Sequence, residues 1–405
     1  MALKMKKFIN NRQTTFAIYC LFSFLFCSFT LPQREKTIYL TYTQDPTQSI
    51  TVQWHSPLKD KCSSVLYRKK GTANWNYQTG VSKQIKNYDY LIHKVELIHL
   101  ESNTEYEFKL ENGSIINFFR TLPSTLKDRP ITVAIGGDVY KNIVTFQKMN
   151  HIVSKQNPDF VILGGDIAYA KGWDFDWIIQ RWINFFTEWN SSMRGKGQRM
   201  IPVVAAAGNH DRNFSDPNII SEELFFLNFG LHEDLISYKN LDVGSYASFF
   251  LLDTNHFQPI EGMQTQWLKD SLLRRAEIPY KFAVYHRPAY PSIYSHKNEI
   301  SQAIRRNWSP VFESMGIILA FEHHNHAYKR TFPLRDECID SSGVIYIGDG
   351  CWGANHRIAD KKWYIDKFKS CTCVNILTLT QDGASFFALS GLNELIDAID
   401  DIQPR

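Results

Sequence analysis

Five short apolar runs in this chain each end in polar side chains of the kind that bind metal ions. The runs read ITVAIGGD, FVILGGDIAY, PVVAAAGNHD, FAVYH and ILAFEHHNH, and they alternate with longer segments of helical character. Continuous apolar runs of this kind predict strands of a mostly parallel or mixed sheet that helices cover on both faces. Residues just past the carboxyl ends of such strands converge on one crevice. We therefore expect an α/β domain with a polar site at that edge.

The N-terminal part of the chain has a different pattern. Short alternating segments run from about residue 37 to 121, with Asp, Pro, Gly and Asn between them. Segments in which apolar and polar residues alternate, bounded by turn residues and without a helical stretch among them, predict the strands of a small β-sandwich. The stretch that follows contains two prolines and no apolar periodicity, as a linker does. We expect the β-sandwich at 31–122, a linker at 123–129 and the α/β domain at 130–395.

Residues 1–30 have the order of a secretory signal peptide. Basic residues precede the apolar stretch FAIYCLFSFLF, and the smaller residues CSFT follow it. An uncleaved anchor is the alternative, but the stretch is shorter than the roughly 20 residues that a spanning helix needs. We therefore expect cleavage near Thr30 and a secreted or a lysosomal or vacuolar protein with no membrane insertion afterwards. Four N-x-[ST] triplets would then be candidate glycosylation sites, at Asn112, Asn190, Asn213 and Asn307.

Charge and cysteine usage limit which partners and disulfide bonds can be expected. The 45 basic and 41 acidic residues are spread along the chain without a block of like charge, so no nucleic-acid partner is expected. Cysteines in the mature chain are Cys62, Cys338, Cys351, Cys371 and Cys373. An odd number leaves at least one thiol unpaired or in an intermolecular bridge, and the spacing does not settle the pairing.

The residues at the strand ends combine carboxylate, amide, phenol and imidazole groups. They are Asp138, Asp166, Tyr169, Asn209, His210, Asp211, His286, His324 and His326. Taken singly, Gly-Gly-Asp is most often a turn, and one histidine is most often a hydrogen-bonded core residue. Five matches in one order make chance a poor explanation. Hard oxygens with imidazole and no cysteine suit iron, manganese or zinc.

These motifs resemble those of the purple acid phosphatases, a family within the metallophosphoesterases. The family motifs GDxG, GDxxY, GNH(D/E), VxxH and GHxH are met by GDVY, GDIAY, GNHD, VYH and HHNHAYKR. The tyrosine of the second motif distinguishes the family from ordinary metallophosphoesterases. The resemblance implies a fibronectin III-like β-sandwich, followed by an α/β metallophosphoesterase domain with two mixed sheets flanked by helices.

The resemblance also implies a binuclear metal centre. Its Fe(III) site would consist of Asp138, Asp166, Tyr169 and His326. Its second site, for divalent iron, zinc or manganese, would consist of Asp166, Asn209, His286 and His324, with Asp166 bridging both ions.

Two further histidines are candidates for catalytic groups. His210 and His296 would bind phosphoryl oxygens and protonate the leaving group, and Asp211 would orient His210. The alternatives are a supporting role for His210 and a surface loop position for His296. Tyr140 and His323 stand where the family has glycine, so we expect added bulk near the site, with His323 at its rim.

The implied activity is that of an acid phosphatase. A metal-bound hydroxide at an Fe(III)–M(II) centre would attack small phosphate monoesters, because Fe(III) is a strong enough Lewis acid to hold hydroxide in mildly acidic solution. The same metals could serve a phosphodiesterase or a nucleotide pyrophosphatase. A non-catalytic extracellular binding protein is the third alternative, and loss of a ligand would be its mark. The oligomeric state stays open, a homodimer included.

Overall fold

The structure is a computed structural model that describes residues 37–85, 88–172, 174–212, 220–229, 235–348 and 350–405. The expected signal peptide at 1–30 and the triplet at Asn213 lie outside these residues. No helix in the described part of the chain is long and apolar enough to cross a membrane.

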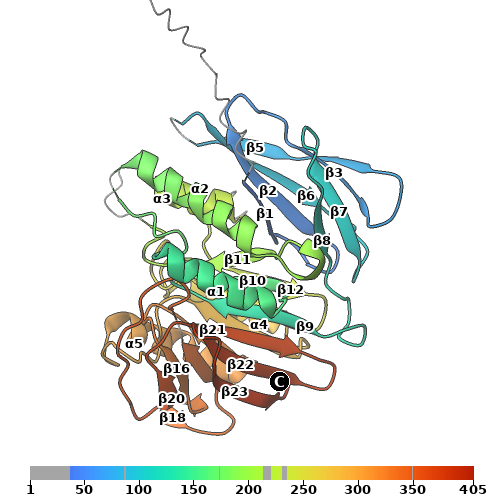
Figure 1. Cartoon of the computed structure of the whole chain (residues 1–405). Coiled ribbons are helices and arrows are strands. Elements are labelled where there is room, and N and C mark those ends of the chain that lie inside the picture. Colours follow the sequence, from blue (N-terminus) through green and yellow to red (C-terminus); the bar gives the residue numbers. More distant parts are fainter. Residues whose placement is uncertain (1–36, 86–87, 173, 213–219, 230–234, 349) are drawn as a thin grey trace, which may run out of the picture. The chain divides into compact units, whose positions relative to one another are not determined.

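The N-terminal part is a sandwich of two four-stranded antiparallel sheets (Figure 1). One sheet has the order β1-β2-β6-β5 and the other β4-β3-β7-β8. The strands are β1 (Thr37–Thr41), β2 (Ile50–Pro57), β3 (Ser64–Lys69), β4 (Asn76–Thr79), β5 (Val81–Gln84), β6 (Tyr90–Leu97), β7 (Glu105–Leu110) and β8 (Asn117–Arg120). Their alternating apolar residues form a shared core, in agreement with the predicted β-sandwich. The strands β4 and β5 were not predicted, because they are largely exposed and lack apolar alternation.

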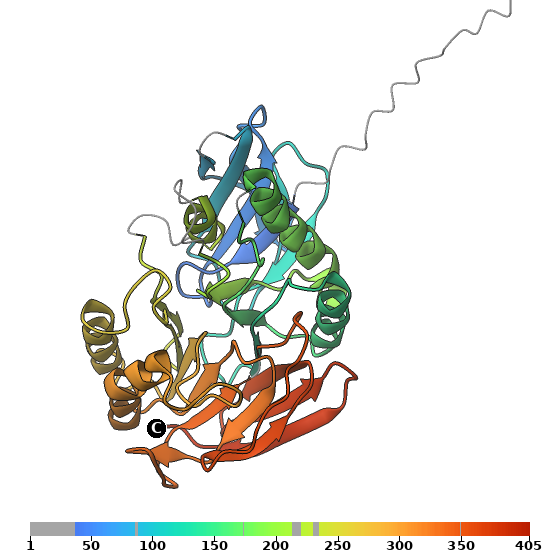
Figure 2. The same ribbon diagram turned by 90° about the vertical axis from the view of Figure 1, so that its left-hand side faces the viewer.

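The following α/β part contains two mixed sheets, as the family resemblance implies. The six-stranded sheet has the order β11-β10-β9-β21-β22-β23, and its strands are β9 (Ile131–Gly136), β10 (Phe160–Gly164), β11 (Val203–Ala206), β21 (Cys373–Leu379), β22 (Ala384–Ser390) and β23 (Leu395–Ile402). The strands β9, β10 and β11 are parallel, and β21 joins β9 in antiparallel orientation. In Figure 2 the red strands near the C-terminus therefore continue the sheet that the green strands begin.

The seven-stranded sheet has the order β12-β13-β14-β15-β19-β16-β20. Its strands are β12 (Lys239–Val243), β13 (Ala247–Leu251), β14 (Tyr280–Tyr285), β15 (Leu319–Glu322), β16 (Tyr328–Thr331), β19 (Ile345–Gly348) and β20 (Ile365–Lys369). The strands β13, β14, β15 and β19 are parallel. A small hairpin of β17 (Leu334–Arg335) and β18 (Cys338–Ile339) lies outside both sheets.

Helices cover the outer faces of the two sheets, whose inner faces share one core. The six-stranded sheet shares one buried core with α1 (Ile143–Lys155), α2 (Phe175–Ser192) and α3 (Ile220–Asn228). The seven-stranded sheet packs against α4 (Met263–Leu273), α5 (Glu299–Asn307) and α6 (Ser309–Met315). Each central strand is thus buried on both faces, which is why its sequence is a continuous apolar run.

The helix α2 also packs against the sandwich. Asp174 caps α2 by accepting a hydrogen bond from the backbone N–H of Trp177. Trp182 and Trp189 are buried on its inner face. The ring of Phe186 stacks on Tyr39 of β1 with centroids 3.7 Å apart.

Candidate metal centre

The structure brings the seven predicted metal ligands into one hydrogen-bonded network at the carboxyl ends of the strands. Asp138 follows β9, Asp166 and Tyr169 follow β10, Asn209 follows β11, His286 follows β14, and His324 and His326 follow β15. Both sheets therefore contribute to one polar site.

Three of these residues contact one another on one side of the site. The Tyr169 hydroxyl donates to Asp138 Oδ1 over 2.9 Å and lies 3.4 Å from His326 Nε2. His326 Nε2 lies 2.7 Å from Asp138 Oδ1. They are three of the four residues that the resemblance assigns to the Fe(III) site, and Asp166 is the fourth.

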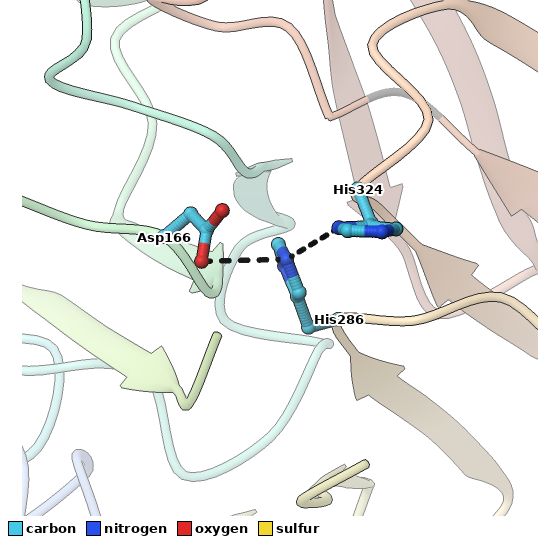
Figure 3. A group of neighbouring side chains, drawn as sticks. All are labelled: Asp166, His286 and His324. Atoms are coloured by element: carbon cyan, nitrogen blue, oxygen red, sulfur yellow. Dashed lines mark hydrogen bonds and ion pairs between the residues drawn. The ribbon is translucent and has the colours of Figure 1, made fainter. Parts of the chain in front are cut away.

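The other four residues form a second group, three of which Figure 3 displays. Ligand atoms of Asp166, His286 and His324 all lie within 4.8 Å of one another. His286 Nε2 is 3.4 Å from Asp166 Oδ1, 3.2 Å from His324 Nδ1 and 3.1 Å from Asn209 Oδ1. The two groups meet where the His324 backbone N–H donates to Asp138 Oδ2 over 2.8 Å.

Two of the imidazoles are oriented as metal ligands usually are. His286 Nδ1 lies 2.9 Å from the Gly164 carbonyl oxygen, and His326 Nδ1 lies 3.1 Å from the Asn355 carbonyl oxygen. A carbonyl accepts only, so each Nδ1 carries a proton, and Nε2 is the atom that would bind a metal ion. The donor set of carboxylate, amide, phenol and imidazole therefore fits hard or borderline metal ions.

The electrostatics of the network favour a cation. Burial would lower the pKa of His286, but the carboxylates of Asp166 and Asp138 outweigh it and raise this pKa to about 9. Burial, together with the same two carboxylates, raises the pKa of the Tyr169 phenol far above its usual value. Ionising that phenol requires a strong positive charge beside it, which a metal ion would supply.

Most of the candidate ligand residues have an unusual backbone conformation. The φ angles of Asp138, Asp166, Tyr169, His324 and His326 are 56°, 55°, 50°, 69° and 57°. A non-glycine residue in the left-handed region costs on the order of 1 kcal/mol or more, and such residues cluster at functional sites. Five of the seven candidate ligands therefore share this conformation, although nine other non-glycine residues elsewhere in the described chain have a positive φ as well.

The glycines of the motifs allow close approach. A Cβ atom on Gly208 would lie 2.1 Å from the backbone nitrogen of Asp166. A Cβ atom on Gly164 would lie 1.7 Å from the ring of His323. The expected rim position of His323 is wrong: its side chain is buried beneath the site, and Gly164 leaves the space that its imidazole needs.

The expected role of Asp211 is also wrong. Asp211 does not orient His210, since its carboxylate accepts hydrogen bonds from the backbone N–H groups of Asp166, Ile167 and Gly208. Burial, with the nearby Asp166 charge, raises the pKa of Asp211 to about 8.

The expectation that Tyr140 adds bulk near the site is wrong too. Its buried ring packs against Phe146 and Phe185 at centroid distances of 5.1 and 6.0 Å, with the Arg181 guanidinium 4.3 Å from the ring centre. The side chain therefore points into the helix-covered core.

The two candidate catalytic histidines lie in different surroundings. His210 lies beside the centre: its backbone N–H donates to Asp166 Oδ1 over 2.6 Å, and its ring lies 4.6 Å from that of Tyr169. The side chain is 39% exposed, so a substrate can reach it. His296 packs against the rings of Tyr290 and Tyr364 instead, and its Nε2 lies 3.9 Å from Glu337.

Three polar residues at the open side of the site were missed by the sequence analysis. The ring of Tyr294 stacks on His324 with centroids 5.3 Å apart, and its hydroxyl accepts a hydrogen bond from Arg357 Nη1 over 2.6 Å. Lys141 Nζ lies 5.6 Å from the centre of the Tyr169 ring. Lys141 could have been suspected from its place beside the first motif, whereas Tyr294 and Arg357 lie on loops without a recognisable pattern.

Comparison with known protein families covers both parts of the chain. A family model described as Purple acid Phosphatase, N-terminal domain, matches residues 36–121, and one described as Calcineurin-like phosphoesterase matches residues 131–320. Together they span well over half of the sequence. The chain belongs to the purple acid phosphatase family. It is therefore a phosphoesterase hydrolase that acts on phosphate esters, and the family implies a binuclear metal centre.

Purple acid phosphatases of Arabidopsis thaliana are similar in sequence. The chain is 25% identical to purple acid phosphatase 23 over 345 residues, which are 76% of this chain and 72% of that protein. It is 27% identical to probable purple acid phosphatase 20 over 357 residues, which are 81% of this chain and 80% of that protein.

Solved structures share the fold. The purple acid phosphatase PPD1 from yellow lupin (Lupinus luteus) seeds has a TM-score of 0.73 at 17% identity, covering 90% of this chain and 73% of that chain. GAP50, described as the anchor in the inner membrane complex of Plasmodium, has a TM-score of 0.50 at 15% identity, covering 68% of this chain and 90% of that chain. The predicted family and fold class are confirmed.

Proposed function

We propose that this purple acid phosphatase relative is an acid phosphatase that hydrolyses small phosphate monoesters at an Fe(III)–M(II) centre. The observation that carries the proposal is the contact between the Tyr169 hydroxyl and Asp138, next to His326. A phenol beside a carboxylate and an imidazole is a donor group suited to Fe(III), and it supports iron over two identical divalent ions.

The proposed ligand sets follow the two groups of contacts. Asp138, Tyr169 and His326 would hold Fe(III), and Asn209, His286 and His324 would hold divalent iron, zinc or manganese, with Asp166 shared by both. Two ions held in this way would act as Lewis acids and would make water a nucleophile at mildly acidic pH.

The residues around the centre would bind and orient the substrate. Lys141 and Arg357 would attract the phosphate dianion, and Arg357 is held in place by its hydrogen bond to Tyr294. The accessible ring of His210 would donate a hydrogen bond to a phosphoryl oxygen or a proton to the leaving oxygen. His296 stays a second candidate for this role, although its packing against Tyr290 and Tyr364 gives it less support.

Hydrolysis of p-nitrophenyl phosphate and of bis(p-nitrophenyl) phosphate tests the substrate class. We expect kcat/KM for the monoester to exceed that for the diester by at least tenfold at about pH 5, because two cations at the rim favour a dianion. A preference for the diester would reject the monoesterase and would favour a phosphodiesterase or a nucleotide pyrophosphatase. Hydrolysis of neither ester by protein loaded with iron and zinc would favour a binding protein.

We further propose that the chain enters the secretory pathway through residues 1–30, and that 31–122, 123–129 and 130–395 are the sandwich, linker and catalytic domain. The exposed turn at Asn112 and the surface position of Asn307 are compatible with glycosylation. N-terminal sequencing of the protein secreted from a eukaryotic host tests whether residues 1–30 act as a signal peptide. A mature N-terminus near residue 31 is expected, and recovery of the uncleaved chain inside the cell would contradict it.

A further inference from the structure

Three cysteines that the metal centre does not use lie close together behind it. They are Cys351, Cys371 and Cys373. Cys351 and Cys373 are fully buried in the core between the two sheets, and their Sγ atoms are 3.6 Å apart. The Cys351 thiol also donates to the Cys371 carbonyl oxygen over 2.8 Å, which holds the two segments together.

The segment that carries Cys351 touches the first candidate ligand. The backbone N–H groups of Trp352 and Gly353 donate to the carbonyl oxygens of Gly137 and Asp138 over 3.1 and 3.0 Å. A Cβ atom on Gly350 would lie 2.5 Å from Asp138 Oδ2, so the backbone of this loop is in direct contact with the carboxylate. Cys373 begins β21, which pairs with β9, the strand that leads to Asp138.

We propose that Cys351 and Cys373 form a disulfide bond that fastens the loop behind Asp138 to strand β21. The sulfurs need to approach by only roughly 1.5 Å to reach the usual bond length of about 2.05 Å. The reaction needs an external oxidant, for which a small-molecule disulfide suffices. The two thiols lose two protons and two electrons, one S–S bond forms in the protein, and the reagent's S–S bond is cleaved to give two thiols. The inference goes beyond the proposed function, because the bond can form whichever ester the enzyme hydrolyses.

Cys371 is the competing partner, because its side chain forms a hydrogen bond with that of Cys373. The chain bends at Cys371, whose backbone N–H donates to the Lys369 carbonyl oxygen over 3.1 Å. A bond between Cys371 and Cys373, two residues apart, would close a small ring, and the resulting strain makes such a bond easily reduced. Cys371 is also only half buried.

A shared metal ion is disfavoured as well. Within the described residues, the only group of three ligand atoms within 4.8 Å is the one at Asp166, His286 and His324. The other cysteines of the described chain, Cys62 and Cys338, lie in the sandwich and in the exposed hairpin strand β18.

Peptide mapping of the mature protein, purified without reductant and alkylated with iodoacetamide before digestion, tests the proposal. We expect a linked peptide pair containing Cys351 and Cys373, with Cys371, Cys62 and Cys338 alkylated. Alkylation of both Cys351 and Cys373 after equilibration with oxidised glutathione would overturn the proposal, as would a bond from Cys371 to either of them.

A stability measurement tests the consequence for the loop. The bond would close a loop of about 23 residues, and its loss should lower the melting temperature by about 4 °C. Both Cys373→Ser and reduction of the wild type should show this loss and a faster release of metal to a chelator, whereas Cys338→Ser should show neither. Equal melting temperatures and equal metal release for oxidised and reduced wild type would overturn the fastening role. These readouts do not depend on activity, so they fail or succeed independently of the proposed ester specificity.

Discussion

Acidification should destabilise this protein through one buried histidine in the sandwich, His55 of β2. Its Nε2 lies 2.8 Å from Asn228 Oδ1 at the end of α3, and the rings of Tyr39 and Phe186 pack against it edge-on at 5.6 and 5.5 Å. Burial, partly offset by the hydrogen bond to Asn228, lowers the pKa of His55 from 6.5 to about 4. The nearby His93 also lowers the pKa of this imidazole, by a smaller amount than burial does.

The sign and size of the effect follow from this lowered pKa. The folded protein keeps His55 neutral while the unfolded chain binds a proton at pH 6.5, so the contribution to stability is complete above pH 6.5 and is lost as the pH falls toward 4. The loss in the free energy of unfolding is about 2 kcal/mol between pH 7 and pH 5 and about 3 kcal/mol by pH 4. An acid phosphatase would therefore work where this part of its stability is being lost.

Urea denaturation at several pH values measures the effect. The difference in unfolding free energy between wild type and His55→Gln should shrink by about 2 kcal/mol between pH 7 and pH 5, because glutamine does not titrate. His151→Gln, at an exposed position on α1, is the matched control and should follow the wild type at every pH. A His55→Gln curve parallel to the wild type would refute the neutral, buried state of His55.

Three further perturbations have defined outcomes. Lys329→Met should lower the free energy of unfolding by about 3–5 kcal/mol, because it leaves the buried Glu322 carboxylate without its cation. The double variant with Glu322→Gln should recover much of that loss in the same denaturation assay. His210→Ala should reduce kcat for an alkyl phosphate by roughly 10²–10⁴ and kcat for p-nitrophenyl phosphate much less, while a larger effect of His296→Ala would reverse our assignment of the proton donor. Arg357→Met should raise KM for the monoester more than it lowers kcat, and an unchanged KM would remove Arg357 from substrate binding.

The positions of the candidate ligands could be predicted because they depend on local sequence and on one general property of parallel sheets. Each apolar run predicts a buried strand, and the carboxyl ends of such strands meet at one edge. Knowing only this, one can place Asp138 near Asp166 although their strands are separated by a helix. The strained φ angles at both residues could not be read from the sequence, since aspartate adopts them only where the surrounding contacts require it.

The surroundings of the ligands were harder to predict, because they depend on contacts between distant segments. The sequence predicts an exposed His323, because this residue stands among polar residues. The space left by Gly164 on another strand lets its side chain become buried. Tyr294 and Arg357 reach the site through loops whose course is set by tertiary packing. The proximity of Cys351 and Cys373 likewise arises from the meeting of two sheets and has no spacing signature.

Metal analysis combined with the visible spectrum of the purified protein tests the proposed Fe(III)–M(II) centre. We expect one iron and one further transition metal per chain, with a charge-transfer band that disappears in Tyr169→Phe, a substitution that removes only the phenol oxygen. Active, colourless protein without iron would contradict the proposed Fe(III) site, and protein that binds no metal under any loading condition would contradict the metal centre itself.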